Sequence, residues 1–174
     1  MTTAAEDRLL VLLRHAEAVD LRGAGDLERE LTDAGVRDAE AAGQWLHEHG
    51  VGIDEVLCSS STRTQQTAEG VWSGGCAEAD VHVDRRLYNA SPEAILDVVR
   101  DADEDANVVM VIAHAPGLPA LASLLADGQG SIAAHEAMGN GFPTTGLALL
   151  RFSGRWRDLD FGDAVLDRFH IARG

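Results

Sequence analysis

The chain has 174 residues, of which 45% are hydrophobic and 25% charged, a length that suits one domain with a sizeable core better than two. Lysine and arginine number 14 against 29 aspartates and glutamates, so the formal net charge at pH 7 is −15. A field of that sign repels nucleic acid and anionic membranes, and we expect neither as a partner. We predict a single domain over residues 1–174, in which an anion can bind only where arginines cluster locally.

The N-terminal residues and the two cysteines bear on the cellular compartment. Residues 1–8 contain no basic signal region, and the apolar run Leu9–Leu13 is too short for a signal peptide or a membrane span. Cys58 and Cys76 match neither a metal-ligand spacing nor a disulfide framework. We therefore expect a protein of the reducing cytoplasm.

The run Leu9–Leu13 predicts a short buried strand that ends on Arg14 and His15. In an open parallel sheet, the C-terminal ends of the strands face the ligand crevice. An arginine offers a planar, permanently charged fork for a phosphate or carboxylate, and a histidine offers a nucleophile or proton carrier. Taken alone, this dipeptide fits an ordinary strand exit beside a half-buried histidine better than a functional site, but a similar pattern recurs downstream.

Strands and helices alternate through most of the chain. Capping signals mark helix starts at Leu31-Thr32-Asp33 and at Ser91-Pro92-Glu93, and one of residues 59–62 can cap another helix. Further strands are expected at 53–58, 81–83 and 108–113, and helices at 33–49, 63–72, 92–100 and 118–125. This alternation is typical of a parallel sheet with helices on both faces.

Two segments predict loops, and the C-terminal region predicts a hairpin. Residues 17–30 are expected to form a loop over the crevice, where binding residues commonly lie. Residues 128–141 hold four glycines and predict a mobile loop with at most a short helix. Strands at 145–152 and 156–161, joined by Ser153-Gly154, predict a hairpin. The predicted fold class is α/β: a three-layer sandwich with a mainly parallel central sheet, helices on both faces and an antiparallel edge hairpin.

Four chemically active side chains follow three different predicted strands: Arg14 and His15, Arg63, and His114. Neighbouring strand ends bring such residues to one crevice. Two guanidinium groups can neutralise phosphoryl oxygens, one imidazole can attack phosphorus, and the second can stabilise charge or move a proton. The cation of Arg63 opposes the dipole of its helix, which favours a functional reason for its position. We expect no metal or cofactor, because the arginines supply the positive charge.

These residues lie in motifs that resemble the histidine phosphatase superfamily, also called phosphoglycerate mutase-like. The motifs are Leu13-Arg14-His15-Ala16-Glu17, residues 59–67 around Arg63, and residues 111–117 around His114. Residues 31–35, 87–92 and 142–147 are similar to the SixA phosphohistidine phosphatases, so the likeness covers nearly the whole chain.

The resemblance implies a metal-independent phosphatase with one histidine-phosphatase-like domain and no cofactor. His15 would be the transiently phosphorylated nucleophile, and Arg14, Arg63 and His114 would form the phosphate pocket. The implied substrate is a protein that carries phosphohistidine.

The sequence departs from the family pattern in three places. Ala16 replaces the glycine of the usual Arg-His-Gly motif, and Ala115 follows His114 where SixA-like proteins often have asparagine. The segment 87–90, Leu-Tyr-Asn-Ala, lacks the carboxylic acid that protonates the leaving group in mutases and ester phosphatases of the superfamily. Glu17 is the closest alternative proton donor. An imidazole leaves phosphorus more easily than an alkoxide does, so a pocket without the acid favours phosphohistidine.

Other functions remain open from the sequence. The chain could be a small-molecule phosphomonoesterase of the same superfamily, or a phosphate-sensing module without catalysis, although mere binding would not require His15. The stretch from Cys58 to Arg63 resembles the Cys-x5-Arg loop of cysteine phosphatases, but only four residues intervene. We interpret Cys58 as a buried small hydrophobe.

His47 and His49 flank a glutamate but point in different directions on a helix, which indicates a solvated helix end and no metal site.

Overall fold

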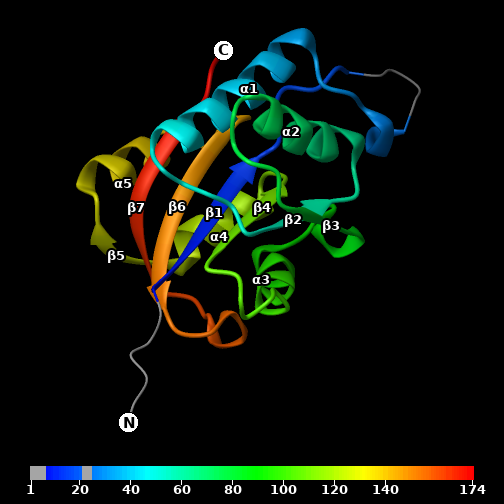
Figure 1. Ribbon diagram of the computed structural model, residues 1–174. Helices are drawn as coiled ribbons and strands as arrows, with labels where there is room; N and C mark the ends of the chain where they lie inside the picture. The colour runs from blue at the N-terminus through cyan, green and yellow to red at the C-terminus, as the bar shows by residue number, and fades with distance from the viewer. Residues whose placement is uncertain (1–6, 21–24) are drawn as a thin grey trace.

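A computed structural model describes residues 7–20 and 25–174, and within these ranges seven strands form one sheet in the order β3-β2-β4-β1-β6-β7-β5 (Figure 1). Strand β6 runs antiparallel to β1 and β7, whereas the other neighbours pair in parallel. The predicted α/β class with a mainly parallel sheet is confirmed. The strands are β1 (Asp7–Arg14), β2 (Glu55–Ser59), β3 (Asp80–Asp84), β4 (Val108–Ala113), β5 (Ala126–Gly130), β6 (Gly146–Ser153) and β7 (Ala164–Ile171).

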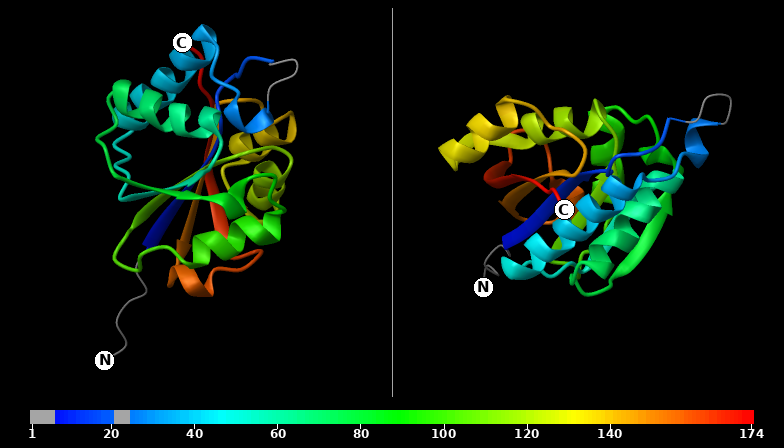
Figure 2. Two further views of the ribbon diagram at one scale, coloured as in Figure 1. Left: turned by 90° about the vertical axis from the view of Figure 1, so that its right-hand side faces the viewer. Right: turned by 90° about the horizontal axis from the view of Figure 1, so that it is seen from above.

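Helices cover both faces of the sheet. Figure 2 shows α1 and α2 on one side of the strands and α4 and α5 on the other. Among the described residues, no helix is both long enough and apolar enough to cross a membrane. The helices are α1 (Asp33–Glu48), α2 (Thr62–Ser73), α3 (Pro92–Arg100), α4 (Gly117–Leu125) and α5 (Ile132–Gly139), with the 3-10 helices η1 (Asp26–Glu28), η2 (Arg85–Leu87) and η3 (Trp156–Asp158).

Strand β1 lies inside the sheet, and its side chains alternate between two hydrophobic clusters. Leu10 and Leu12 belong to the cluster under α3 and α4, whereas Val11 and Leu13 belong to the cluster under α1 and α2. All four side chains are fully buried. Because a strand alternates its faces, a continuous apolar run fits only a strand that is covered on both sides. This placement directs the end of β1, and therefore Arg14, toward the C-terminal edge of the sheet.

Side-chain caps begin the helices where the sequence predicts them. The hydroxyl oxygens of Thr32, Ser61 and Ser91 each accept a hydrogen bond from the backbone N–H three residues later, at 2.9, 3.3 and 3.2 Å. Each cap satisfies a backbone donor that the first helical turn leaves unpaired. The apolar Val36 lies on the outer side of α1 and is 40% exposed.

The glycine-rich segment 128–141 is more ordered than predicted. Residues 126–130 form the edge strand β5 beside β7, and α5 follows, capped by the hydroxyl of Ser131. Gly128 and Gly130 adopt positive φ angles of 87° and 95° within β5, a conformation that glycine enters without steric penalty. These two glycines therefore serve an irregular edge strand, so the prediction of a loop was wrong at 128–130, whereas the short helix that it allowed is present as α5.

The predicted strand at 156–161 is also wrong. Residues 156–158 form η3, and the buried Trp156 indole donates from Nε1 to the carbonyl of Ala106 at 2.7 Å. Strand β7 begins only at Ala164, so Ser153-Gly154 is not a two-residue hairpin turn. Strands β6 and β7 still form the predicted antiparallel pair, but β5 covers its outer side and the pair is not at the sheet edge.

We predict that Gly43→Ala destabilises the protein because α1 and α2 touch there. A Cβ at Gly43 would lie 2.0 Å from the carbonyl oxygen of Val71. The helices must separate, which should cost roughly 1–3 kcal/mol and lower the urea midpoint. Gly139→Ala is the matched control, because that helical glycine has open space around it, and it should change stability by less than about 1 kcal/mol. Equal midpoints for the two variants would contradict the close helix contact.

Candidate active site

The residues predicted from three strand ends do meet in one place. Arg14 and His15 end β1, His114 follows β4, and Arg63 lies in the first turn of α2, which follows β2. The ring centroids of His15 and His114 are 5.2 Å apart, and Nη2 of Arg63 lies 3.3 Å from Nδ1 of His114. The alternating strand order places β4 between β1 and β2, so their parallel ends form one edge.

His15 is held in one tautomer by its own backbone. Its Nδ1 lies 2.7 Å from the carbonyl oxygen of Ala16, and a carbonyl can only accept, so Nδ1 carries the proton. The lone pair is therefore on Nε2. Burial lowers the pKa of His15 to about 4, with added repulsion from Arg63 and Arg14, although the bond to Ala16 acts in the opposite direction. At neutral pH this imidazole is uncharged and has the free lone pair that a nucleophile needs.

The backbone around His15 is anchored on both sides. The N–H of Ala16 donates to Oγ1 of Thr67 on α2 at 3.0 Å, and this hydroxyl donates in turn to the carbonyl of Arg63 at 2.7 Å. The N–H of Thr145 lies 3.2 Å from the carbonyl oxygen of His15. Thr67 therefore ties the end of β1 to the helix that carries Arg63, and it fixes two functional residues relative to each other.

His114 is also neutral, with the opposite tautomer. Arg63 can only donate, so Nδ1 of His114 accepts from it, and Nε2–H donates to Oγ of Ser59 at 2.8 Å. Burial lowers the pKa of His114 to about 3, and the neighbouring His15 and Arg63 lower it further. The sequence did not single out Ser59 for this task. A hydroxyl at the end of β2 is an ordinary helix-cap signal and does not by itself reveal a histidine partner.

Two guanidinium donors in the site have no partner. Among the described residues, Nε of Arg14 and Nε of Arg63 are buried side-chain atoms without a hydrogen bond. A buried, unpaired charged donor is costly, and an oxyanion is the ligand that best satisfies a pair of guanidinium groups. The site can therefore hold a phosphoryl group beside His15.

Asp26 on η1 is a residue of the site that the sequence did not identify. Its backbone oxygen and its Oδ2 accept from the two Nη atoms of Arg63 at 2.8 and 3.0 Å. The hydroxyl of Tyr88 also donates to Oδ2, and Arg29 pairs with Oδ1 at 3.0 Å. The segment 17–30 was predicted to carry binding residues, but nothing marked Asp26 among its other acids. Residues 21–24 of that predicted loop lie outside the described residues.

The environment of Asp26 keeps it ionised. The hydrogen bond from Tyr88 and the pairing with Arg29 and Arg63 hold the pKa of its carboxyl well below the usual range. The same bond raises the pKa of the Tyr88 hydroxyl. The ring of Tyr88 meets that of His114 edge-on, with 5.6 Å between the centroids. A carboxylate without a proton cannot act as a general acid, so Asp26 does not replace the missing acid of segment 87–90.

Glu17 has a structural contact that the sequence did not suggest. Its side chain is exposed, and Oε1 accepts from the hydroxyl of Thr32 at 2.9 Å, while its carbonyl accepts from the Thr32 N–H at 3.0 Å. These bonds tie Glu17 to the start of α1. Its assignment as the proton donor stays a prediction.

The environment of Cys58 argues against the mechanism of cysteine phosphatases. Cys58 is fully buried in β2, and burial raises the pKa of its thiol to about 12. A thiol with that pKa holds almost no thiolate at neutral pH, and the thiolate is the nucleophile in cysteine phosphatases. Cys58 is a packing residue, as the sequence suggested.

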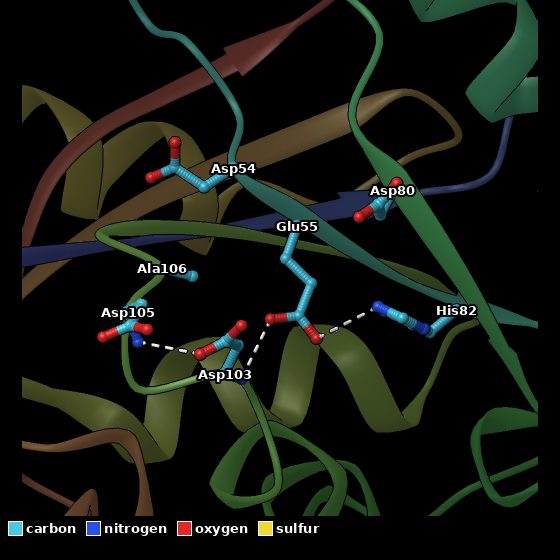
Figure 3. A pocket seen from close by; sticks show the side chains of 7 residues that line it. All are labelled: Asp54, Glu55, Asp80, His82, Asp103, Asp105 and Ala106. Atoms are coloured by element: carbon cyan, nitrogen blue, oxygen red, sulfur yellow. Dashed lines mark hydrogen bonds and ion pairs between the residues drawn. The ribbon is translucent and has the colours of Figure 1, made fainter.

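An acidic pocket at the opposite ends of β2, β3 and β4 is a separate feature (Figure 3). Its carboxylates are used by the backbone: Glu55 accepts from the N–H of Asp103, and Asp54 accepts from the N–H groups of Asn107 and Val108, each at 2.9 Å. Across residues 7–20 and 25–174, no group of three or more His, Cys, Asp or Glu is placed to hold a metal ion. We interpret this pocket as a loop anchor.

We predict that His15 stays neutral to low pH in solution. Nitrogen-15 NMR of the imidazole should show a protonated Nδ1 and a bare Nε2 at pH 7, with a titration midpoint near 4, because the pKa is lowered to about 4. His15→Ala assigns the resonances. A midpoint at 6 or above, near the ordinary value of about 6.5, would contradict the burial argument.

We also predict that Asp26→Asn tightens the binding of inorganic phosphate. The carboxylate accepts from one Nη of Arg63 and repels an anion, so its removal should lower the dissociation constant roughly threefold to tenfold, as expected for one partly solvated charge. Isothermal titration calorimetry measures the effect. Asp97→Asn is the control, since Asp97 pairs with Arg100 on the exposed side of α3 and should leave phosphate affinity unchanged. Weaker binding by Asp26→Asn would show that Asp26 mainly orients Arg63.

Known proteins share this sequence and fold. A model of the histidine phosphatase superfamily (branch 1) matches residues 10–93. An uncharacterised protein of Mycobacterium tuberculosis strain H37Rv is 36% identical over 162 residues, which are 92% of this chain and 100% of that protein.

Solved structures extend the likeness over nearly the full length. A Nakamurella multipartitia protein, described as a candidate phosphohistidine phosphatase SixA, has a TM-score of 0.86 at 34% identity, with 98% of this chain and 99% of that chain covered. A SixA candidate from Agrobacterium tumefaciens has a TM-score of 0.75 at 28% identity, with coverage of 94% and 97%. The chain therefore belongs to the histidine phosphatase superfamily.

Proposed function

We propose that this protein is a phosphatase that passes a phosphoryl group through a covalent intermediate on His15, with protein phosphohistidine as its substrate. The observation that carries this proposal is a neutral histidine with a free Nε2 lone pair beside two unpartnered arginine donors. A site that only binds phosphate has no use for a buried, tautomerically fixed imidazole. The superfamily to which the chain belongs supports the same reaction class.

The proposed first step is an in-line displacement at phosphorus. Nε2 of His15 forms a bond to phosphorus, and the bond from phosphorus to the leaving imidazole breaks. The imidazole keeps the electron pair and leaves neutral, because its other ring nitrogen already carries a proton. Arg14 and Arg63 offset the charge on the phosphoryl oxygens, and His114 lies near the same oxygens. In the second step a water attacks phosphorus, the electron pair returns to Nε2, and phosphate is released.

We propose that no metal ion takes part, because two guanidinium groups supply the neutralising charge that Mg²⁺ supplies in kinases. Losing one such donor should lower the rate about 100-fold or more. Both Cys58 and Cys76 are free thiols, in line with the reducing cytoplasm as the proposed location.

The proposed preference for phosphohistidine rests on proton supply. Among the described groups around His15, Asp26 is held ionised, and the lowered pKa of His114 leaves it uncharged at pH 7. Neither can deliver a proton as an acid in the free enzyme. An alkoxide is a strong base and needs that proton, whereas a substrate imidazole, with an unperturbed pKa of about 6.5, can arrive already protonated.

We predict a steep dependence of kcat/KM on the leaving group. Phosphohistidine should react fastest and aryl phosphates should follow the acidity of their phenol. Alkyl phosphates should be at least about 100-fold slower than acidic aryl phosphates, because general acid help of about 10² to 10⁴-fold is missing. Steady-state phosphate release with excess chelator measures all three classes.

Covalent trapping supplies the control. Enzyme quenched without acid should hold label that is acid-labile and alkali-stable, and His15→Ala should hold none. Label on His15→Ala would refute the nucleophile. An alkyl phosphate as the best substrate would instead favour a small-molecule phosphomonoesterase, with Glu17→Gln as the next variant to examine. Phosphate binding without any turnover would favour the sensing module.

A further inference from the structure

A second cavity, of about 350 Å³, opens next to His114. Its walls come from two connections, the segment 89–92 before α3 and the segment 115–117 that joins β4 to α4. Ala120 of α4 completes it. We call it the neutral pocket. His114 lines this pocket, and the centroid of its ring lies 5.2 Å from that of His15, so the pocket adjoins the candidate phosphoryl site.

The walls of the neutral pocket are packed tightly against each other. A Cβ at Gly117 would lie 2.0 Å from the carbonyl oxygen of Ala90 and 3.2 Å from Cδ1 of Ile95. Gly117 itself is buried, and Ile95 belongs to the main hydrophobic cluster. The connection after β4 therefore rests directly on the segment before α3, and the pocket has a preformed shape that needs no ordering on binding.

The chemistry of the neutral pocket differs from that of the phosphoryl site. Its lining consists of alanine, proline, glycine, serine and asparagine side chains together with His114, and none of them is charged at pH 7, since the pKa of His114 is lowered to about 3. A second phosphate or a carboxylate placed here would lose hydration and gain no counter-charge. An uncharged ring would gain apolar contact with Ala90, Pro92 and Ala120. The volume is near the lower end of ligand pockets, which span about 300–1,000 Å³, and suits a ring with a short chain attached.

We propose that the neutral pocket holds the leaving group and selects a ring that is bonded directly to phosphorus and carries no anionic group over a chain that carries a further anionic group. This inference rests on the proposed function. It adds a structural selection to the argument from proton supply: a phosphohistidine imidazole can lie against His114 while its phosphoryl group faces His15. Sugar bisphosphates and phosphorylated carboxylic acids are disfavoured by the same walls.

The test fills the pocket and compares two phosphoramidates. Phosphoramidate itself releases ammonia and has no ring, whereas N-phosphohistidine releases imidazole from the same kind of P–N bond. Ala120→Phe should lower the ratio of kcat/KM for N-phosphohistidine to that for phosphoramidate by at least about tenfold, the usual scale for a lost pocket contact. Ser123→Phe is the matched control, because Ser123 is exposed on α4, does not line the pocket and should leave the ratio unchanged.

A second variant tests selection by charge and does not depend on a bulky side chain being accommodated. Ala120→Lys should raise kcat/KM for 4-carboxyphenyl phosphate relative to phenyl phosphate, because the ammonium supplies the missing counter-charge. An unchanged ratio in either variant that remains folded by circular dichroism would overturn the neutral pocket. Failure of the proposed function looks different: the wild-type protein would hydrolyse neither phosphoramidate nor N-phosphohistidine.

Discussion

The hydrogen bond from Nδ1–H of His15 to the carbonyl of Ala16 is the constraint on which the site depends. It uses the carbonyl group of a residue two positions beyond the end of β1, so the geometry of a central strand sets the tautomer of His15. The anchoring of Ala16 N–H on Thr67 stops that backbone from turning away. A histidine on a free loop would exchange tautomers and protons with water. Here the direction of the lone pair on Nε2 follows from strand pairing between β1 and β4.

Keeping two imidazoles neutral in this place has a consequence for stability. The folded pKa values of His15 and His114 are lowered to about 4 and about 3, so between pH 6.5 and those values the unfolded chain binds more protons than the folded one. Stability therefore falls as pH falls through that window. The same burial and the same arginine charges keep His15 uncharged, as the proposed nucleophile requires. The site thus keeps His15 uncharged in a protein whose net charge is −15, and the stability of the fold in acid is lower as a result.

The fold could be predicted where local and global signals agree. Apolar runs predicted β1, β2 and β4, and Thr32, Ser61 and Ser91 lie where capping was expected. The errors lie where tertiary contacts decide. Trp156 suited a strand by composition, but the Ala106 carbonyl beneath it and the Phe152 ring beside it hold it in a 3-10 turn. The glycines of 128–141 suggested a loop, because the local sequence does not show that the edge of β7 is available to pair with β5.

The site shows the same division between local and tertiary information. Arg14, His15, Arg63 and His114 could be found because each follows a strand end, where position predicts proximity. Asp26 could not, since its importance arises from Arg63 and Tyr88, both distant in the sequence. That acid changes the chemical interpretation. A carboxyl group near His15 is a natural candidate for the proton donor. The hydrogen bonds that Asp26 accepts, however, stabilise its ionised form. The carboxylate instead pairs with Arg63, so this arginine has a partner when the proposed phosphoryl group is not bound.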